Sequence, residues 1–272
     1  MSSSKPFRIA VCFSGQLRHW RTAVNNIKKF FEFKHPHPVT GQKVQTDYFV
    51  HTWDINTWRL PKTDHSIYEE RPHDDMDDFC EAYNPISYIL EEWDKESFPL
   101  AWDPMFYSFE RSLLLKRDHE IRNGFDYDIV IKVRPDVVYN PAVKFPIGRV
   151  WPMTCYTVTP VSRLTFEFNY PNFDDVMFYG DSPTMDAISD IYDVHNTQFR
   201  TVSRDEQLNS LNANPNLFYG PGALLYEHMT NLGIHPEGNR VVEYAVVRDT
   251  SAELDGVEDY AEIRKRWFEW YI

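Results

Sequence analysis

The beginning of the chain contains a strand, a helix and a second strand, and this unit constrains the fold more than any other feature. The apolar run Arg8–Gly15 predicts a buried strand that ends in a turn of small residues. Residues 19–34 follow with helical spacing, which places five apolar side chains on one face: Trp20, Val24, Ile27, Phe30 and Phe31. Asp47–Asp54 is the second predicted strand. Successive strand-helix-strand units are typical of a parallel sheet with right-handed crossovers.

The rest of the chain continues this alternation. In order, we predict a strand at Ile86–Glu92, a helix at Pro104–Gly124, a strand at 127–133, a strand at Val176–Tyr179 with a helix after it, a helix after Gly222 and a strand at 241–249. Residues 55–78 are polar and irregular, and we expect them to run over the surface. No shift of composition and no repeat marks a boundary. The sequence therefore predicts a single α/β domain over residues 1–272, with a mostly parallel central sheet flanked by helices and a flexible N-terminus at 1–6.

The charge balance argues against two classes of partner. The 272 residues include 28 Lys and Arg against 41 Asp and Glu, which gives a net charge of −13. Such a chain repels polyphosphate at long range, so we expect neither nucleic acid nor an anionic membrane as a partner. A small anionic ligand is compatible with this charge, because arginines or a divalent metal ion can reverse the sign inside a cleft.

Cysteine usage and the lack of long apolar runs indicate the compartment. The three cysteines, Cys12, Cys80 and Cys155, form no CxxC pair, which favours a reducing environment over a disulfide framework or a cysteine zinc site. No stretch has the character of a signal peptide or the length of a membrane span. We therefore expect a soluble, cytoplasmic protein without stable membrane insertion, and the oligomeric state stays open.

Polar groups follow three of the predicted strands, and open parallel sheets bind ligands at the carboxyl ends of their strands. The first group suits a phosphate through backbone N–H groups and an arginine: Ser14, Gly15, Gln16 and Arg18. The second group suits a nucleoside through hydrogen bonds and stacking: His51, Thr52, Trp53 and Asp54. The alternatives are an ordinary turn with a solvated arginine, and a packed tryptophan beside a satisfied histidine.

The third group, Arg134-Pro135-Asp136, interrupts an apolar run that resumes at Val137. Proline cannot donate to a sheet ladder, so we expect strand pairing to break there and to leave Asp136 at a strand end. A carboxylate facing a phosphate would be repelled by it, which points to a bridging Mg²⁺ or Mn²⁺. The alternative is a turn in which the arginine and the aspartate pair with each other.

Four stretches, in this order and spacing, resemble the GT-A-type glycosyltransferases: RIAVCFSGQLR, DYFVHTWD, YSFERSLLLKRDHE with YDIVIKVRPD, and DDVMFYGDSPTMDAI. The likeness covers most of residues 8–250. It is to small soluble enzymes of large algal viruses (chloroviruses) and of bacterial polysaccharide loci. The resemblance implies a GT-A-like (Rossmann-like) fold, with a nucleotide-sugar-binding half at 8–140 and an acceptor-binding half with the C-terminal tail at 141–272. For a viral protein it implies action in the host cytoplasm.

The resemblance also implies a donor site. In these enzymes an Asp-X-Asp motif ends a central strand and holds a metal ion on the diphosphate. Here Asp136 matches the last carboxylate and would hold Mn²⁺ or Mg²⁺, while Arg134 replaces the first and could substitute for part of the metal's charge. The nucleotide sugar would be held from the turn after the first strand, by Ser14, Gln16 and Arg18, and from the long helix, by Tyr107, Ser108 and Arg111.

An inverting transferase needs a carboxylate that takes the proton of the acceptor hydroxyl. Asp174 and Asp175 precede a predicted strand, and because neighbouring strand residues point to opposite sides, one of them should face the cleft. We favour Asp175; the alternative is that both are turn residues. Arg248, near the end of a late strand, either returns to the diphosphate or is a surface arginine.

These features predict a glycosyltransferase that moves one sugar from a UDP- or GDP-sugar to a hydroxyl of a glycan acceptor. Two alternatives stay open: a non-catalytic carbohydrate-binding protein, and a nucleotide-sugar hydrolase or nucleotidyltransferase. The acids at 74–78 are predicted to cap a helix rather than bind metal, and His35 and His37 to lie in a loop. The basic, aromatic tail at 264–272 is predicted to pack back on the domain.

Overall fold

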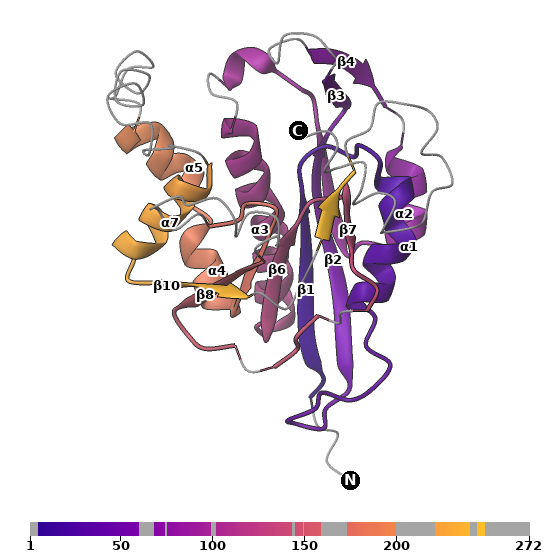
Figure 1. The fold of residues 1–272 in the computed structure, drawn as a ribbon, viewed down its shortest axis with the longest axis vertical. Helices are drawn as coiled ribbons and strands as arrows, with labels where there is room; N and C mark the ends of the chain where they lie inside the picture. Colours follow the sequence, from indigo (N-terminus) through magenta and orange to yellow (C-terminus); the bar gives the residue numbers. More distant parts are fainter. Residues whose placement is uncertain are drawn as a thin grey trace.

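The computed structural model describes residues 5–59, 68–73, 75–98, 102–142, 145–148, 150–158, 173–199, 221–239 and 244–247. Its centre is a seven-stranded sheet in which every pairing is parallel except those of β9 (Figure 1). In spatial order the strands are β10 (His235–Asn239), β8 (Thr154–Val158), β9 (Met177–Gly180), β6 (Ile129–Val133), β1 (Phe7–Ser14), β2 (Val44–Trp53) and β5 (Ser87–Glu91). The predicted α/β class with a mostly parallel central sheet is confirmed.

The path of the chain through this sheet creates a switch point. From β1 the chain passes outward to β2 and then to the edge strand β5, and helix α3 (Asp103–Asn123) precedes its return to β6, which pairs with the other side of β1. The order of the strands therefore reverses between β1 and β6. In open α/β sheets, the crevice outside the carboxyl ends at such a reversal is where ligands bind.

Helices cover both faces of the sheet, because the strands bury side chains on both sides (Figure 1). On β1, Val11 and Phe13 belong to one apolar cluster with residues of α1 (Trp20–Phe31) and α2 (Met76–Tyr83). Ala10 and Cys12 face the opposite cluster, with residues of α3, α4 (Ser182–Ile188), α5 (Ile191–Val194) and α7 (Pro221–Asn231). None of the described helices combines the length and the apolar character of a membrane span.

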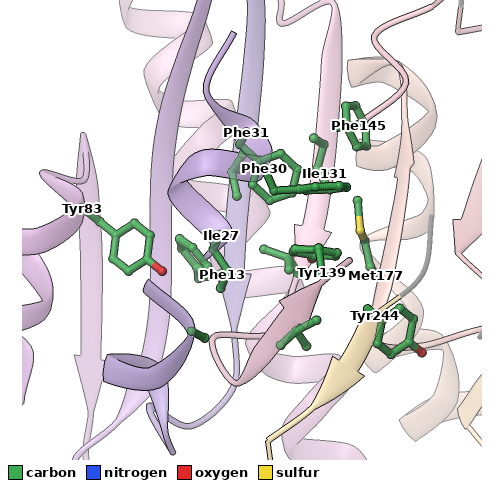
Figure 2. Packing of buried hydrophobic residues seen from close by; sticks show 14 of the residues in the cluster. Phe13, Ile27, Phe30, Phe31, Tyr83, Ile131, Tyr139, Phe145, Met177 and Tyr244 are labelled. Carbon is green, nitrogen blue, oxygen red and sulfur yellow. The ribbon is translucent and has the colours of Figure 1, made fainter. Parts of the chain in front are cut away.

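Helix α1 also holds the segment that follows β6. The Asn26 side chain donates to the Tyr139 carbonyl at 2.8 Å and accepts from the Tyr139 N–H at 2.6 Å. The rings of Phe30 and Tyr139 stack with centroids 4.0 Å apart, in the cluster that Figure 2 shows. Tyr139 ends the short strand β7 (Val137–Tyr139), which pairs antiparallel with β11 (Tyr244–Val246).

Several local elements differ from the sequence prediction. Residues 55–78, expected to be irregular, contain the antiparallel strands β3 (Ile55–Arg59) and β4 (Tyr68–Pro72), and α2 begins at Met76. Strand β2 begins at Val44, three residues before the predicted start. Strands β8 and β10 were not predicted; β10, with the sequence HPEGN, contains no β-branched residue and no Phe, Tyr or Trp. Two short helical turns complete the described elements, η1 (Lys95–Ser97) and η3 (His195–Phe199).

Helix α3 is fixed to α4 by a buried ionic cluster. The Lys116 ammonium is fully buried and donates to Glu120 Oε2 at 2.8 Å, Ser182 Oγ at 2.6 Å and Asp186 Oδ1 at 2.7 Å. Glu120 Oε1 also accepts from the Ser182 hydroxyl at 2.8 Å and the Tyr127 N–H at 2.7 Å, just before β6. Every N–H of the ammonium has an acceptor, which compensates part of the cost of burying its charge.

We predict that Lys116→Met destabilises the fold strongly, because it leaves the Glu120 and Asp186 carboxylates without their cation. Loss of one partner from a buried ion pair costs about 3–5 kcal/mol, measurable as the free energy of unfolding in urea. The control is Arg122→Ala, which removes an exposed i,i+4 pair with Asp118 and should cost less than about 1 kcal/mol. Equal losses for the two variants would contradict the role of the cluster.

Candidate active site

The candidate site lies where β1 and β6 end side by side. Phe13 pairs with Val133 in the parallel ladder, so the turns that follow these strands begin next to each other. One turn carries Arg18 and the other carries Arg134-Pro135-Asp136. Pairing stops at Val133 and resumes at Val137, which confirms the predicted interruption at Pro135.

Arg134 and Asp136 form a two-point ion pair. The Arg134 Nε donates to Asp136 Oδ1 at 2.9 Å and its Nη2 donates to Oδ2 at 2.6 Å, while Arg18 Nη2 lies 3.7 Å from Oδ2. The Asp136 side chain is only 2% exposed, and its backbone carbonyl accepts from the Val247 N–H at 2.8 Å. Burial lowers the pKa of Arg134, but the Asp136 carboxylate outweighs this effect and the pKa lies above its ordinary value. Of the two alternatives for this motif, the structure has the internal pair.

The metal ion on Asp136 stays a prediction. The arrangement of the carboxylate does not fit it, because both oxygens already accept from Arg134 and a second guanidinium lies close. Within the described part of the chain, no three His, Cys, Asp or Glu side chains are grouped as a metal site would require. We therefore assign no chemical step to a metal ion.

Lys132 is a third cation at this place, and it was not among the predicted site residues. Its side chain is buried within β6, its Nζ donates to the Asp175 backbone carbonyl, and it lies 5.6 Å from the centre of the Phe178 ring. Burial lowers the pKa of Lys132 to about 8, against the opposing effect of nearby carboxylates, Asp175 first among them. The signal was present in the sequence: a lysine inside the apolar run IVIKV is rare unless it has a partner.

The two candidate bases occupy different environments. Asp174 is buried: its Oδ1 accepts from the Val176 N–H at 2.9 Å, and its Oδ2 accepts from the Tyr244 hydroxyl. Asp175 is half-buried, and no described residue hydrogen-bonds its carboxylate. Its charge lies close enough to Lys132 and Arg134 to favour their protonated forms, which for Lys132 opposes the larger effect of burial on its pKa. Asp174 therefore holds the start of β9, and Asp175 is the more available carboxylate.

The turn after β1 is built around Gly15. Its φ of 110° lies in the left-handed region, and its N–H donates to the Ser108 hydroxyl of α3 at 2.7 Å. Ser108 was predicted to face the nucleotide but is fully buried, where it also contacts His51 Nδ1 at 2.8 Å. Ser14 is buried as well, whereas Gln16 and Arg18 are half-buried in the turn.

The first turn of α1 follows directly after this turn. His19, in the left-handed region at φ 50°, stands at the N-cap without a capping side-chain hydrogen bond, and the first turn contains no acidic residue. The unsatisfied N–H groups at a helix N-terminus carry partial positive charge and attract anions. Arg18 precedes this terminus by one residue, so both supply positive charge at the switch point.

The groups at the end of β2 are structural. His51, Thr52 and Trp53 are buried, and the Trp53 ring stacks on Tyr107 with centroids 5.6 Å apart. Asp54 Oδ1 accepts from the Trp93 N–H at 2.8 Å, which ties the ends of β2 and β5 together. The packed alternative thus holds for Trp53, and the contacts of these four residues shape the rim, while their predicted contact with a ligand stays a prediction.

Glu91 organises the exposed part of this rim and was missed. At the end of β5, its Oε2 accepts from the Tyr107 hydroxyl at 2.9 Å and its Oε1 accepts from Arg111 Nε at 3.1 Å. The predicted pair Tyr107 and Arg111 therefore does face the carboxyl ends of the strands, with Arg111 35% exposed. The sequence contained a signal for Glu91, because a glutamate at the end of an apolar strand lies where ligands bind in such sheets. The remaining predicted site residue, Arg248, lies outside the described residues.

The comparisons with known proteins give structural likenesses but no match in sequence. No protein-family model and no curated protein matches the chain. Among solved structures, a glycosyltransferase involved in the glycosylation of the major capsid of PBCV-1 aligns over 92% of this chain and 98% of its own, with 9% sequence identity and a TM-score of 0.39. A likeness at this level does not establish a shared family or activity.

We predict that His51 makes the stability of the fold depend on pH. Burial lowers the pKa of His51 from 6.5 to about 4, so the unfolded chain binds a proton there at a higher pH than the folded protein does. The contribution is fully present above about pH 6.5 and is lost as the pH falls towards 4, by about 3 kcal/mol in total.

Denaturation in urea at several pH values between 4 and 7 measures this loss. His51→Gln should reduce the slope of the free energy of unfolding against pH, whereas His35→Gln, in an exposed loop position, should keep the wild-type slope. Identical slopes for wild type and His51→Gln would contradict the assignment.

Proposed function

We propose that this protein is a cytoplasmic glycosyltransferase, which transfers a single sugar from a nucleotide-sugar donor to a hydroxyl of a glycan acceptor. The observation that carries the proposal is the grouping of three cations, Arg18, Lys132 and Arg134, with the carboxylates of Asp136 and Asp175 at the switch point of a parallel sheet. Cations suit a diphosphate leaving group, and an available carboxylate suits the activation of a hydroxyl. The sequence motifs that resemble GT-A-type glycosyltransferases supply the end of β1, the end of β6 and the start of β9 in this arrangement.

The donor would lie along the carboxyl ends of four neighbouring strands, β6, β1, β2 and β5. Three strand spacings, about 14 Å in total, separate the two end strands. The diphosphate would bind near Arg18, Arg134 and the N-terminus of α1, and the nucleoside would extend toward Tyr107 and Arg111. One extended ligand could contact both groups, and a UDP- or GDP-sugar combines the required anionic centre with an aromatic base.

The reaction that we propose inverts the anomeric centre. Asp175 takes the proton from the acceptor hydroxyl while the hydroxyl oxygen forms a bond to the anomeric carbon of the donor. The bond from that carbon to the diphosphate oxygen breaks, and the nucleoside diphosphate leaves with the electron pair. Arg18 and Arg134 would stabilise the charge that develops on the leaving oxygen.

A thermal-shift screen, followed by a transfer assay, tests the proposal. The ligands are UDP, GDP, CMP and dTDP and several of their sugars, each with Mn²⁺, with Mg²⁺ and with EDTA. A nucleotide at a hundredfold excess over its Kd should add about 2.7 kcal/mol of stability. Detection of a glycosylated acceptor supports the transferase. Release of free sugar alone would favour the hydrolase, and stabilisation by glycans but by no nucleotide would favour the carbohydrate-binding alternative.

We predict that Asp175→Asn reduces turnover about 10²-fold or more and leaves the Kd of the donor near its wild-type value, because a general base acts on the acceptor. Steady-state kinetics of transfer and a direct binding measurement separate these two quantities. An unchanged turnover would show that Asp175 is not the base.

For Asp174→Asn we predict the opposite pattern. The substitution removes the charge that accepts from the Val176 N–H and the Tyr244 hydroxyl, so unfolding should become easier by about 1–3 kcal/mol while the folded enzyme keeps most of its turnover. The assay is urea denaturation beside the same kinetics. If this variant alone loses turnover, the roles of the two aspartates are reversed.

A further inference from the structure

We infer that the donor site binds its diphosphate without a divalent metal ion, and that Asp136 is a positioning residue for guanidinium groups instead of a metal ligand. The inference rests on the proposed function and goes beyond it by assigning how the charge of the donor is neutralised. It is carried by the geometry of Arg134, Asp136 and Arg18.

The first step concerns what a metal ion at Asp136 would require. A metal ligand must present a carboxylate oxygen to the ion, but both Asp136 oxygens accept from the Arg134 fork and the side chain is only 2% exposed. A dication would have to displace this planar, two-point pair, the geometry in which arginine binds carboxylate best. It would then lie among three cations: Arg18, Lys132 and Arg134.

The second step concerns what remains available to a phosphate. A guanidinium has five N–H donors, and the pair with Asp136 uses about two of them, those on Nε and Nη2. The remaining donors of Arg134 are on the same planar group, which Asp136 prevents from rotating. Arg18 is 29% exposed and reaches the same carboxylate from the turn after β1. Asp136 therefore orients two arginines of neighbouring turns with one side chain.

The third step concerns the charge of the leaving group. In the reaction proposed above, the diphosphate gains negative charge as the bond to the anomeric carbon breaks. Guanidinium groups that are already oriented stabilise such charge without reorganisation, which is the same service that a metal ion would supply. The N-terminus of α1 adds a further positive partial charge at the end of β1.

The experiment measures nucleotide binding rather than activity. Isothermal titration of the full chain with UDP and with GDP, in EDTA, in Mg²⁺ and in Mn²⁺, should give dissociation constants for the bound nucleotide that agree within about twofold. Binding that disappears in EDTA and returns with Mn²⁺ would overturn the inference and leave the glycosyltransferase proposal intact. Absence of binding to any nucleotide of the screen under all three conditions would overturn the proposed function itself.

Two variants test the guanidinium groups. Arg18→Met, at a partly exposed position, should weaken nucleotide binding roughly tenfold or more in EDTA without lowering the melting temperature. Arg134→Lys keeps the charge but loses the two-point pair, and should weaken binding while adding no dependence on Mn²⁺. The matched control, Arg122→Ala on the exposed face of α3, should bind nucleotide like wild type. Wild-type affinity in both site variants would overturn the assignment.

Discussion

The return of the chain through helix α3 is the constraint on which the rest of the structure depends. Without it, β6 would not pair with β1, and the two turns that carry the candidate site would not begin side by side. The helix is fixed at two places by polar groups in its buried face. Ser108 in its first half holds the Gly15 N–H and His51, and Lys116 further along holds α4 through Ser182 and Asp186. The same helix thus sets the fold and the shape of the turn after β1.

Lys116 and Arg134 use their charges in two distinct ways, and the number of satisfied N–H donors separates them. The Lys116 ammonium gives all of its N–H groups to carboxylates and a hydroxyl, so no donor remains for a ligand. Arg134 gives only part of its guanidinium to Asp136 and keeps donors on the same rigid plane. The first arrangement is a structural tie. The second holds in place a guanidinium that is 17% exposed and has further N–H donors, as recognition of a phosphate requires.

The elements with a strong sequence pattern were predicted correctly, whereas elements and buried residues that depend on contacts between distant parts of the chain were not. Apolar runs and helix-end signals identified β1, β6 and α3, whereas β10 has no pattern that distinguishes it from a loop and forms because β8 offers an edge. The strand ends were correctly predicted to converge. Spacing alone placed Ser108 beside Tyr107 as a ligand-facing residue, but the close approach of Gly15 buries it. The burial of Ser108 depends on Gly15, 93 positions away in the sequence, so the residues next to Ser108 could not predict it.

The sequence of Arg134-Pro135-Asp136 is compatible with a metal ligand and with an internal ion pair, and the structure contains the ion pair. The two charged residues are two positions apart, so their side chains can lie on one side of the chain, and Pro135 ends the ladder that would otherwise constrain them. Because so short a loop closes at little entropic cost, the ion pair forms without help from a ligand. A donor would therefore meet guanidinium groups that are already oriented, and binding would not include the cost of ordering them. In a site that forms around a metal ion, the binding groups are not ordered before the ion binds. The dependence of nucleotide affinity on metal therefore distinguishes such a site from one in which the arginines are already oriented.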